Sequence, residues 1–480
     1  MDCFQNKAYI NGEWVSAYDG KTFPVYNPAT GLCLDEVPDM GEAETRFAID
    51  SAQKALKSWK NSSASERSHL LKRWHQLLLE HKNELARVLT SEQGKPLAEA
   101  IAEVKYGLSY IEWFAEEARR IYGDIIPGQD TSKRIMVLKE AVGVVGLITP
   151  WNFPNAMIAR KIGAALAAGC TVVVKPAEET PFSTLAMAYL AELAGFPKGV
   201  INVVTSNQPE VVGAVLCNHS DVKKISFTGS TAVGKLLMQQ SAGSVKRLSL
   251  ELGGNAPFIV FEDADIDSAI KGLMQSKYRN AGQTCVCANR ILVQNSIHDD
   301  FVNRLSEETA KLKIGNGFDE GVDIGPLINE NALQKMETLV ADAILQGAVC
   351  KIGGKKMNPR QLYYEPTVLT GVTENMRICQ EEIFGPISAI STFQNEAEAI
   401  QMANNTSSGL AAYFYGRDIN RIYRVMEALE FGMVGVNTGL LSTVTAPFGG
   451  IKESGFGREG SSYGIEEYLN MKYICIGDIK

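Results

Sequence analysis

The chain has 480 residues, of which 45% are hydrophobic, with a formal charge of −8 and an isoelectric point of about 5.4. This length predicts roughly two to four domains with sizeable cores. The interspersed acids and bases lack the basic stripe of nucleic-acid-binding proteins, and no window reaches the roughly 18 apolar residues of a membrane span. We therefore expect neither a nucleic-acid partner nor a membrane.

Cysteine and histidine usage narrows the chemistry. The nine cysteines are odd in number and scattered, and the first residues show no basic-then-apolar leader, so we expect a cytoplasmic protein without a disulfide framework. The five histidines form no paired-ligand motif. We expect no metal, and therefore a carboxylate as any general base.

The first 140 residues predict a hairpin, a helical region and an arm. In Ala8–Val15 an Asn-Gly step lies between apolar pairs, which is typical of a hairpin turn. From Glu42 to Tyr122 the apolar residues recur at helical spacing. Residues 122–140 then favour an extended excursion.

From Ala141 onward, buried strands alternate with helices. Val142–Ile148 is a continuous apolar run followed by a predicted helix over Pro154–Ala168, and a second alternation starts at Phe258. Such alternation predicts an α/β fold with two Rossmann-like parallel-sheet domains, which bind ligands at the carboxyl ends of the strands. The hinge between the domains is expected near residues 251–255.

A cysteine in the segment 279–287 is the candidate nucleophile. Cys285 follows Gly-Gln-Thr, short residues that let backbone and substrate approach closely. A thiol also needs an oxyanion donor and a base, and Asn152 and Glu251 offer an amide and a carboxylate. The alternatives are a cysteine that only packs, an asparagine that caps the next helix, and a loop carboxylate.

Two further segments suggest a nucleotide. Lys175 and Glu178 follow a predicted strand, where Lys175 can donate to an adenosine ribose and Glu178 can accept from its 2′-hydroxyl; the alternative is a solvated loop pair. Gly229-Ser230 opens a helix whose free N–H groups suit a pyrophosphate. Residues 229–236 also approximate a P-loop, which leaves an NTPase as the rival class, although Leu236 occupies the position of the Mg²⁺-binding hydroxyl.

Six motifs in order resemble the aldehyde dehydrogenase superfamily over nearly the whole chain. They are Trp151-Asn152-Phe153-Pro154, Lys175-Pro176-Ala177-Glu178, Phe227-Thr228-Gly229-Ser230, Glu251-Leu252-Gly253-Gly254, Gly282-Gln283-Thr284-Cys285 and Glu382-Ile383-Phe384-Gly385-Pro386.

The resemblance implies an NAD-binding domain, a catalytic domain and a small β oligomerisation arm, assembled as a homodimer or homotetramer. The arm would include the tail Tyr473–Lys480, which in this family extends a partner's sheet. Trp151, Glu382 and Phe384 would contact the cofactor, the last two at the nicotinamide ribose and ring. The implied boundaries are 1–122 with 142–253 for the NAD-binding domain, 254–460 for the catalytic domain, and 123–141 with 461–480 for the arm.

Within the superfamily, residues 276–290 are similar to the active-site segment of succinate-semialdehyde dehydrogenases. In that subfamily the positions of Arg160, Arg279 and Ser442 grip the distal carboxylate of the substrate, and Arg can bind a carboxylate in a bidentate manner. The alternative for Arg160 is a surface charge. Glu178 would repel a 2′-phosphate, which favours NAD, with NADP as the weaker alternative.

The resemblance implies oxidation of succinate semialdehyde to succinate. Cys285, with its pKa lowered by dipoles and by the cofactor's charge, would attack as a thiolate, Asn152 would hold the oxyanion, and Glu251 would activate the hydrolytic water. Glutarate semialdehyde or another short aldehyde is the alternative substrate. Cys287 is expected to pack, with a reversible disulfide to Cys285 as the alternative.

Overall fold

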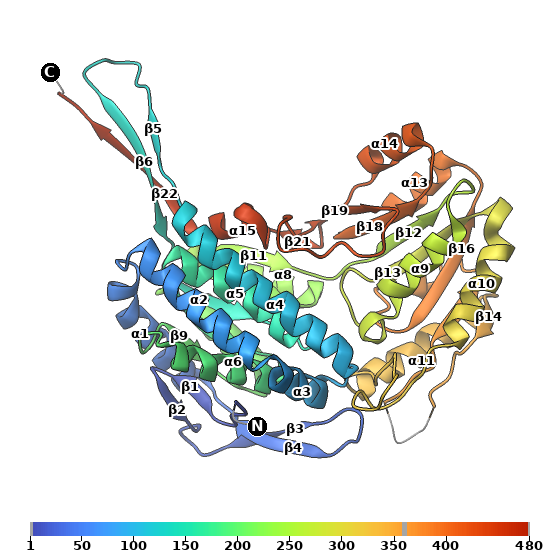
Figure 1. Ribbon diagram of the computed structural model, residues 1–480, viewed down its shortest axis with the longest axis horizontal. Helices are drawn as coiled ribbons and strands as arrows, with labels where there is room; N and C mark the ends of the chain where they lie inside the picture. Colours follow the sequence, from blue (N-terminus) through green and yellow to red (C-terminus); the bar gives the residue numbers. More distant parts are fainter. Residues whose placement is uncertain (1–2, 358–361, 479–480) are drawn as a thin grey trace.

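The computed structural model describes residues 3–357 and 362–478, and it contains two large sheets and a projecting arm (Figure 1). Each large sheet and its helices form one side of the molecule (Figure 1). This confirms the expected α/β class with two parallel-sheet domains. Within the described ranges, no helix is long and apolar enough to cross a bilayer.

The first sheet has eight strands, of which β9, β8, β7, β10 and β11 run parallel. Parallel strands covered by helices on both faces bury all their side chains, which explains their continuous apolar runs. In spatial order the strands are β2 (Glu13–Val15), β1 (Ala8–Ile10), β9 (Ile201–Val203), β8 (Thr171–Lys175), β7 (Val144–Ile148), β10 (Val222–Thr228), β11 (Arg247–Glu251) and β21 (Gly455–Phe456).

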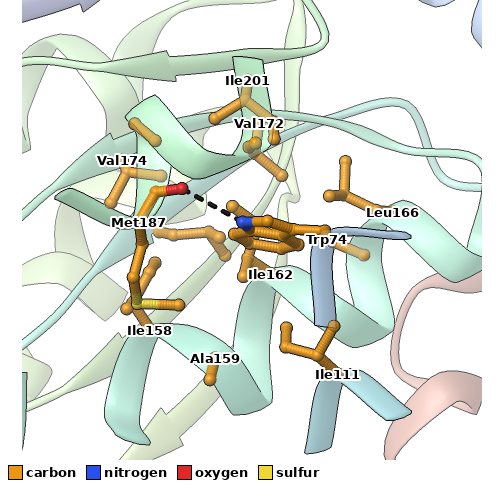
Figure 2. Close-up of a cluster of buried hydrophobic side chains, with 14 of the residues drawn as sticks. Trp74, Ile111, Ile158, Ala159, Ile162, Leu166, Val172, Val174, Met187 and Ile201 are labelled. Carbon is orange, nitrogen blue, oxygen red and sulfur yellow. Dashed lines mark hydrogen bonds between the residues drawn. The ribbon is translucent and has the colours of Figure 1, made fainter. Parts of the chain in front are cut away.

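Helices cover both faces of this sheet, and alternate strand residues contribute to a core on each face. Trp74 lies in the larger core against Ile111, Ile162 and Val172, and its indole Nε1 donates to the carbonyl oxygen of Met187 at 3.1 Å (Figure 2). The helices on that face are α2 (Ala64–Glu80), α3 (Lys82–Gln93), α4 (Leu97–Glu117), α5 (Pro154–Ala168) and α6 (Pro181–Ala194); the others are α1 (Glu42–Trp59), α7 (Pro209–Asn218) and α8 (Thr231–Ser241).

The second sheet has seven strands, all parallel to their neighbours except the edge strand β14. Its order is β14 (Val349–Ile352), β15 (Thr367–Thr370), β16 (Ile387–Phe393), β13 (Ala288–Gln294), β12 (Ala256–Val260), β18 (Ala411–Tyr415) and β19 (Met433–Val436). The helices of this half are α9 (Ile266–Lys277), α10 (His298–Ala310), α11 (Glu330–Leu345), α12 (Arg377–Gln380), α13 (Glu396–Asn404) and α14 (Ile419–Ala428).

The arm is a three-stranded sheet of β5 (Asp124–Ile126), β6 (Arg134–Ala141) and β22 (Leu469–Ile476), and it projects away from both halves (Figure 1). β22 pairs with β6 of the same chain along its whole length. The described part of the tail therefore belongs to the chain's own arm, and residues 479–480 lie outside the described part. Ile125 is 84% exposed and Tyr473 63% exposed.

The chain passes from the first sheet to the second between the end of β11 at Glu251 and the start of β12 at Ala256, within the expected hinge. Two later segments pack differently from the implied boundaries. β21 pairs with β11 in the first sheet through Glu251 and Gly455, although the boundary at residue 460 assigns it to the second domain. The short helix α15 (Ser461–Glu466), assigned to the arm, instead buries Ile465 in the core that contains Trp74.

Small two-stranded sheets complete the fold. They are β3 (Thr22–Tyr26) with β4 (Cys33–Pro38), and β17 (Ser408–Gly409) with β20 (Ile451–Lys452).

Candidate active site

Cys285 lies in the loop between α9 and β13, where the backbone takes an unusual path. Asn280 and Ala281 both have φ of 53°, in the left-handed region that residues other than glycine rarely adopt, a strain that is common at functional sites. The loop also approaches the interdomain segment closely, because a Cβ on Gly254 would lie only 2.4 Å from the carbonyl oxygen of Cys285. Cys285 is half-buried and lines two cavities.

The first cavity, of about 210 Å³, is mostly apolar, and its charged lining residues are two arginines and two carboxyl side chains, Glu99 and Glu103. It brings Arg160, Arg279 and Ser442 together around one small volume that ends at Cys285. The other lining residues are Ala102, Tyr106, Phe153, Met157, Thr284, Val286 and Phe448. We call this space the substrate cavity.

The second cavity, of about 360 Å³, lies between the two large domains. It contains Cys285 and the candidate amide and base, Asn152 and Glu251. It also gathers the expected cofactor contacts Trp151, Gly229, Ser230, Glu382 and Phe384. We call it the cofactor cavity. The three proposed catalytic side chains therefore converge on one volume, although they come from three distant segments.

Asn152 does not cap the following helix. The N-cap residue of α5 is Phe153, and no side chain makes a capping hydrogen bond at this end of the helix. The Asn152 amide Nδ2 instead donates to the carbonyl oxygen of Gln283, at 3.1 Å, in the nucleophile loop. This bond uses one of the two amide hydrogens and leaves the other for a ligand in the cavity.

Glu251 is 3% exposed at the end of β11, and its Oε2 has no hydrogen-bond partner among the described residues. Burial, reinforced by the negative charge of Glu459, raises the pKa of Glu251 well above its usual value. Lys161 and Arg160 oppose this shift. Enzymes use burial in this way to bring the pKa of a carboxyl general base closer to neutral pH.

The expectation of a lowered thiol pKa does not hold for the protein alone. Burial raises the pKa of Cys285 to about 12, and the carboxylates of Glu382 and Glu251 add to the shift. Arg160 and Arg279 act in the opposite direction. The protein by itself therefore holds Cys285 as a thiol, because its side chain is buried and two carboxyl groups line the same cavity.

Arg160 is not a surface charge, since it is only 2% exposed on α5. Its Nη1 lies 3.1 Å from Oε2 of Glu459, and its guanidinium faces the ring of Phe448 with 4.4 Å from Cζ to the ring centroid. Burial disfavours its charge, but Tyr106, Tyr110 and Glu459 outweigh this and raise its pKa. Arg160 is therefore charged at any physiological pH.

Arg279 differs from Arg160 in its partners. Its guanidinium lies over Phe153, with 5.3 Å from Cζ to the ring centroid, and its buried Nε has no partner. Among the described residues, no carboxylate lies within 4.0 Å of it. Arg279 is thus the cation of the substrate cavity whose charge is least compensated.

Lys175 and Glu178 form an ion pair of 2.7 Å at the carboxyl end of β8. Lys175 is 3% exposed, whereas the Glu178 side chain is 34% exposed. Lys175 pairs in register with Ile148, the last residue of β7, from which the chain runs on to Trp151. The pair therefore lies beside the segment that enters the cofactor cavity.

The N-terminus of α8 opens into the cofactor cavity. Ser230 caps the helix by accepting from the N–H of Val233 at 3.4 Å. In a P-loop, the lysine of this segment would reach toward the phosphates. Lys235 is instead exposed and pairs with Glu453 at 2.8 Å, which argues against a P-loop. The remaining N–H groups of the first turn still suit an anion.

All nine cysteines lie in the described ranges, and none forms a disulfide. Cys287 is buried, and its thiol donates to the carbonyl oxygens of Lys277 and Ala288 at 3.7 and 3.4 Å. Both thiols of the Cys285/Cys287 pair are free in this structure.

Glu459 is a residue of the site that carried no local signal in the sequence. Glu459 accepts from Arg160 and from Lys161, with 2.5 Å between Lys161 Nζ and its Oε1, yet it lies 208 positions from Glu251. Burial opposes ionisation of Glu459, but Lys161 and Arg160 prevail and hold its pKa below the usual value. The antiparallel pairing of β21 with β11, and the bridge between Glu459 and Phe448, bring this segment back to the site.

Comparison with known proteins identifies the family. The model of the aldehyde dehydrogenase family matches residues 14–474. The chain belongs to the aldehyde dehydrogenase family. It is 55% identical to glutarate-semialdehyde dehydrogenase of Pseudomonas aeruginosa over 99% of this chain and 98% of that protein. It is also 55% identical to the NADP⁺ succinate-semialdehyde dehydrogenase of Escherichia coli, with the same coverage of 99% and 98%.

Solved structures of aldehyde dehydrogenases share the architecture. A crystal structure described as an NADP-dependent enzyme of Escherichia coli superimposes with a TM-score of 0.98 at 55% identity, covering 99% of both chains. Aldehyde dehydrogenases use NAD or NADP, and the cofactor cavity has features that fit such a group. The ring of Trp151 meets that of Phe384 edge-on at 5.5 Å, and Glu382 places a carboxylate beside Gly253, where a Cβ would lie 3.0 Å from its Oε2.

Proposed function

We propose that this aldehyde dehydrogenase oxidises succinate semialdehyde to succinate with NAD. One observation carries the proposal: Cys285 lies where the substrate cavity, with its two arginines, meets the cofactor cavity. A thiol at that junction can reach the aldehyde end of a short substrate whose carboxylate end lies against Arg160 and Arg279. The two ends of the molecule then have chemically matched surroundings.

The first half of the reaction is nucleophilic. The positive charge of a bound oxidised nicotinamide would favour loss of the Cys285 proton to solvent, and the resulting thiolate attacks the aldehyde carbon to form a thiohemiacetal with an oxyanion. Asn152 donates its free amide N–H to this oxyanion together with the backbone N–H of Cys285, and removal of one such donor typically costs about 3 kcal/mol. A bound oxidised nicotinamide, held by Trp151, Glu382 and Phe384, would supply the hydride acceptor, and loss of hydride from the thiohemiacetal leaves a thioester on Cys285.

The second half is hydrolysis. Glu251, in its ionised form, takes a proton from a water that attacks the thioester carbon, and the C–S bond breaks to release succinate and the free thiol. The unpaired Oε2 of Glu251 supports this role, because it leaves an acceptor available on the cavity side. The presence of a water-activating base also argues against a CoA-acylating enzyme, because an enzyme that transfers the acyl group to CoA does not need to activate water.

The substrate class follows from the charge of its cavity. A buried arginine recognises a carboxylate by charge-assisted hydrogen bonds. A substrate carboxylate would pair directly with Arg279, which is half-buried and interacts with Glu99 without forming a direct ion pair. Ser442 adds a hydroxyl donor to the same wall.

Glutarate semialdehyde is the alternative substrate. The observation that supports this alternative is the 55% identity to a glutarate-semialdehyde dehydrogenase. The two substrates differ by one methylene, which is worth only about 1–3 kcal/mol of discrimination.

NAD rather than NADP is proposed because of Glu178. Its carboxylate, held by Lys175 at 2.7 Å, is placed to accept from a 2′-hydroxyl and would repel a 2′-phosphate. Lys175 alone would favour the phosphate, but its charge is already paired.

Assembly and location complete the proposal. The exposed apolar residues of the arm, among them Ile125, Met471 and Tyr473, support a homodimer or homotetramer. Nine unpaired cysteines support a cytoplasmic location. We retain the division into an NAD-binding domain, a catalytic domain and an arm, with β21 and α15 packed on the first of these.

The proposal is tested by initial rates over a panel of aldehydes, with NAD and NADP compared at each. We expect the highest kcat/KM for succinate semialdehyde with NAD, a lower value for glutarate semialdehyde, and much lower values for uncharged aldehydes of equal length. Equal rates for charged and uncharged aldehydes would contradict the proposed substrate class.

A further inference from the structure

The loop that carries Asn152 is fixed by an acidic side chain from another helix. α5 begins with Pro154 after an N-cap phenylalanine, so its first-turn N–H groups have no acceptor of their own. Glu103 of α4 supplies one: its Oε1 accepts from the N–H of Asn155 at 3.0 Å and of Ala156 at 3.2 Å. A carboxylate at this end of a helix is also favoured by the helix dipole.

A buried lysine joins this carboxylate to the backbone of Asn152. Lys95 Nζ lies 2.5 Å from Oε2 of Glu103 and 2.8 Å from the carbonyl oxygen of Asn152, and it faces the ring of Phe153 with 3.9 Å to the centroid. An ammonium has three hydrogens, and these three neighbours account for all of them. Both charged side chains are 1% exposed.

The same carbonyl is held from the opposite loop. Asn280 Nδ2 donates to the carbonyl oxygen of Asn152 at 2.9 Å and to that of Gln283 at 3.2 Å. Because the Asn152 amide itself donates to Gln283, the amide orientation depends on how the two loops are held together. Lys95 secures the Asn152 side of this junction.

We propose that Lys95, together with Glu103, is a positioning residue that aims the Asn152 amide at the oxyanion formed on Cys285. This inference rests on the oxyanion role assigned to Asn152 under the proposed function. Lys95 touches neither cavity's contents itself, and it acts through the backbone of Asn152. A displacement of a catalytic group by about 1 Å typically costs up to about 100-fold in rate.

Folding does not by itself require a charged pair at this position. A buried ion pair is often replaceable by apolar side chains at little cost in folding, because desolvation offsets much of the attraction. The positioning role therefore predicts a variant that folds but reacts slowly.

The test is a double-mutant cycle read in the first turnover. The single-turnover rate of NADH formation is measured for the wild type, Lys95→Met, Asn152→Ala and the double variant. We expect Lys95→Met to slow this rate by about 10- to 100-fold, and by less than about twofold when Asn152 is already alanine, since coupled residues are not additive. NAD affinity, measured by titration, stays within about twofold.

Three controls separate the outcomes. Lys224→Met removes another fully buried lysine, outside both cavities, and should leave the single-turnover rate unchanged. Lys95→Met with Glu103→Gln removes both charges, so that no uncompensated carboxylate compromises folding, and thermal melting checks each variant. We expect this pair to be as slow as Lys95→Met.

Two results would overturn the positioning role: a near-wild-type rate in Lys95→Met, or the same fractional loss in both Asn152 backgrounds. A near-wild-type rate in Asn152→Ala would instead remove the oxyanion assignment, and the inference would fall with it.

Discussion

Arg160, in the wall of the substrate cavity, is already paired with Glu459, with 3.1 Å between Nη1 and Oε2. Its charge is therefore shared between a protein carboxylate and any substrate carboxylate. Arg279 has no such partner among the described residues. The two arginines thus contribute unequally to substrate recognition, and Arg279 is expected to contribute more.

Arg279→Ala should raise KM for succinate semialdehyde by about 10- to 100-fold, because a hydrogen bond to a charged group is worth about 1.5–3 kcal/mol. KM for an uncharged aldehyde of the same length is the internal control and should change little. Steady-state kinetics on both substrates measures the effect. An equal increase for both aldehydes would show that Arg279 supports the cavity without binding the carboxylate.

Glu178→Ser should shift cofactor preference toward NADP. The substitution removes a carboxylate that would face the 2′-phosphate, and like-charge juxtaposition costs several kcal/mol. It also frees Lys175 from its 2.7 Å ion pair. We expect the ratio of kcat/KM for NADP to that for NAD to rise about 10-fold or more. An unchanged ratio would mean that the 2′-position lies elsewhere.

Hydrolysis of the thioester should speed up as pH rises. Burial, with help from Glu459, raises the pKa of Glu251, so the carboxyl is protonated and inactive as a base at low pH and becomes ionised as pH increases. Rapid mixing after the first turnover, from about pH 6 to about pH 9, separates this step from formation of the thioester. A hydrolysis rate independent of pH would exclude Glu251 as the titrating base.

Cys287→Ser tests the alternative to simple packing of Cys287, which is a reversible disulfide with Cys285. Peroxide converts two thiols into a disulfide and water, and the wild type should lose activity and regain it with dithiothreitol. The serine variant should start with near-wild-type activity, because a serine hydroxyl can also donate to the backbone carbonyls that the Cys287 thiol contacts. It should then be inactivated without full recovery, since Cys285 would oxidise further. Identical recovery in both proteins would remove the disulfide.

Much of the fold was predictable because it depends on local patterns. The helix Pro154–Ala168 was expected with the bounds that the structure gives, since a proline opens it and an apolar run defines its length. The Asn-Gly hairpin and the parallel strands followed from equally local signals. The implied boundaries at residues 460 and 461 differ from the packing because β21 is only two residues long and pairs with a strand some 200 positions earlier.

The candidate site was predictable where side chains cluster in motifs, and not where they meet only in space. Cys285, Asn152 and Glu251 lie in short segments with a chemical signature, and they meet in the cofactor cavity. Glu459 and Lys95 lie in short connecting segments that look ordinary in the sequence. Likewise, the pKa of the Cys285 thiol is raised first by burial and further by Glu382 and Glu251, and no pattern around Cys285 indicates these neighbours.

The most direct test of the account is the time course of NADH formation by Glu251→Gln. We predict a burst of about one NADH per active site followed by a stall, because the thioester forms on Cys285 but no base activates water. Cys285→Ala is the matched control and should give neither burst nor turnover. Steady turnover of Glu251→Gln at the wild-type rate, with no burst, would contradict the account.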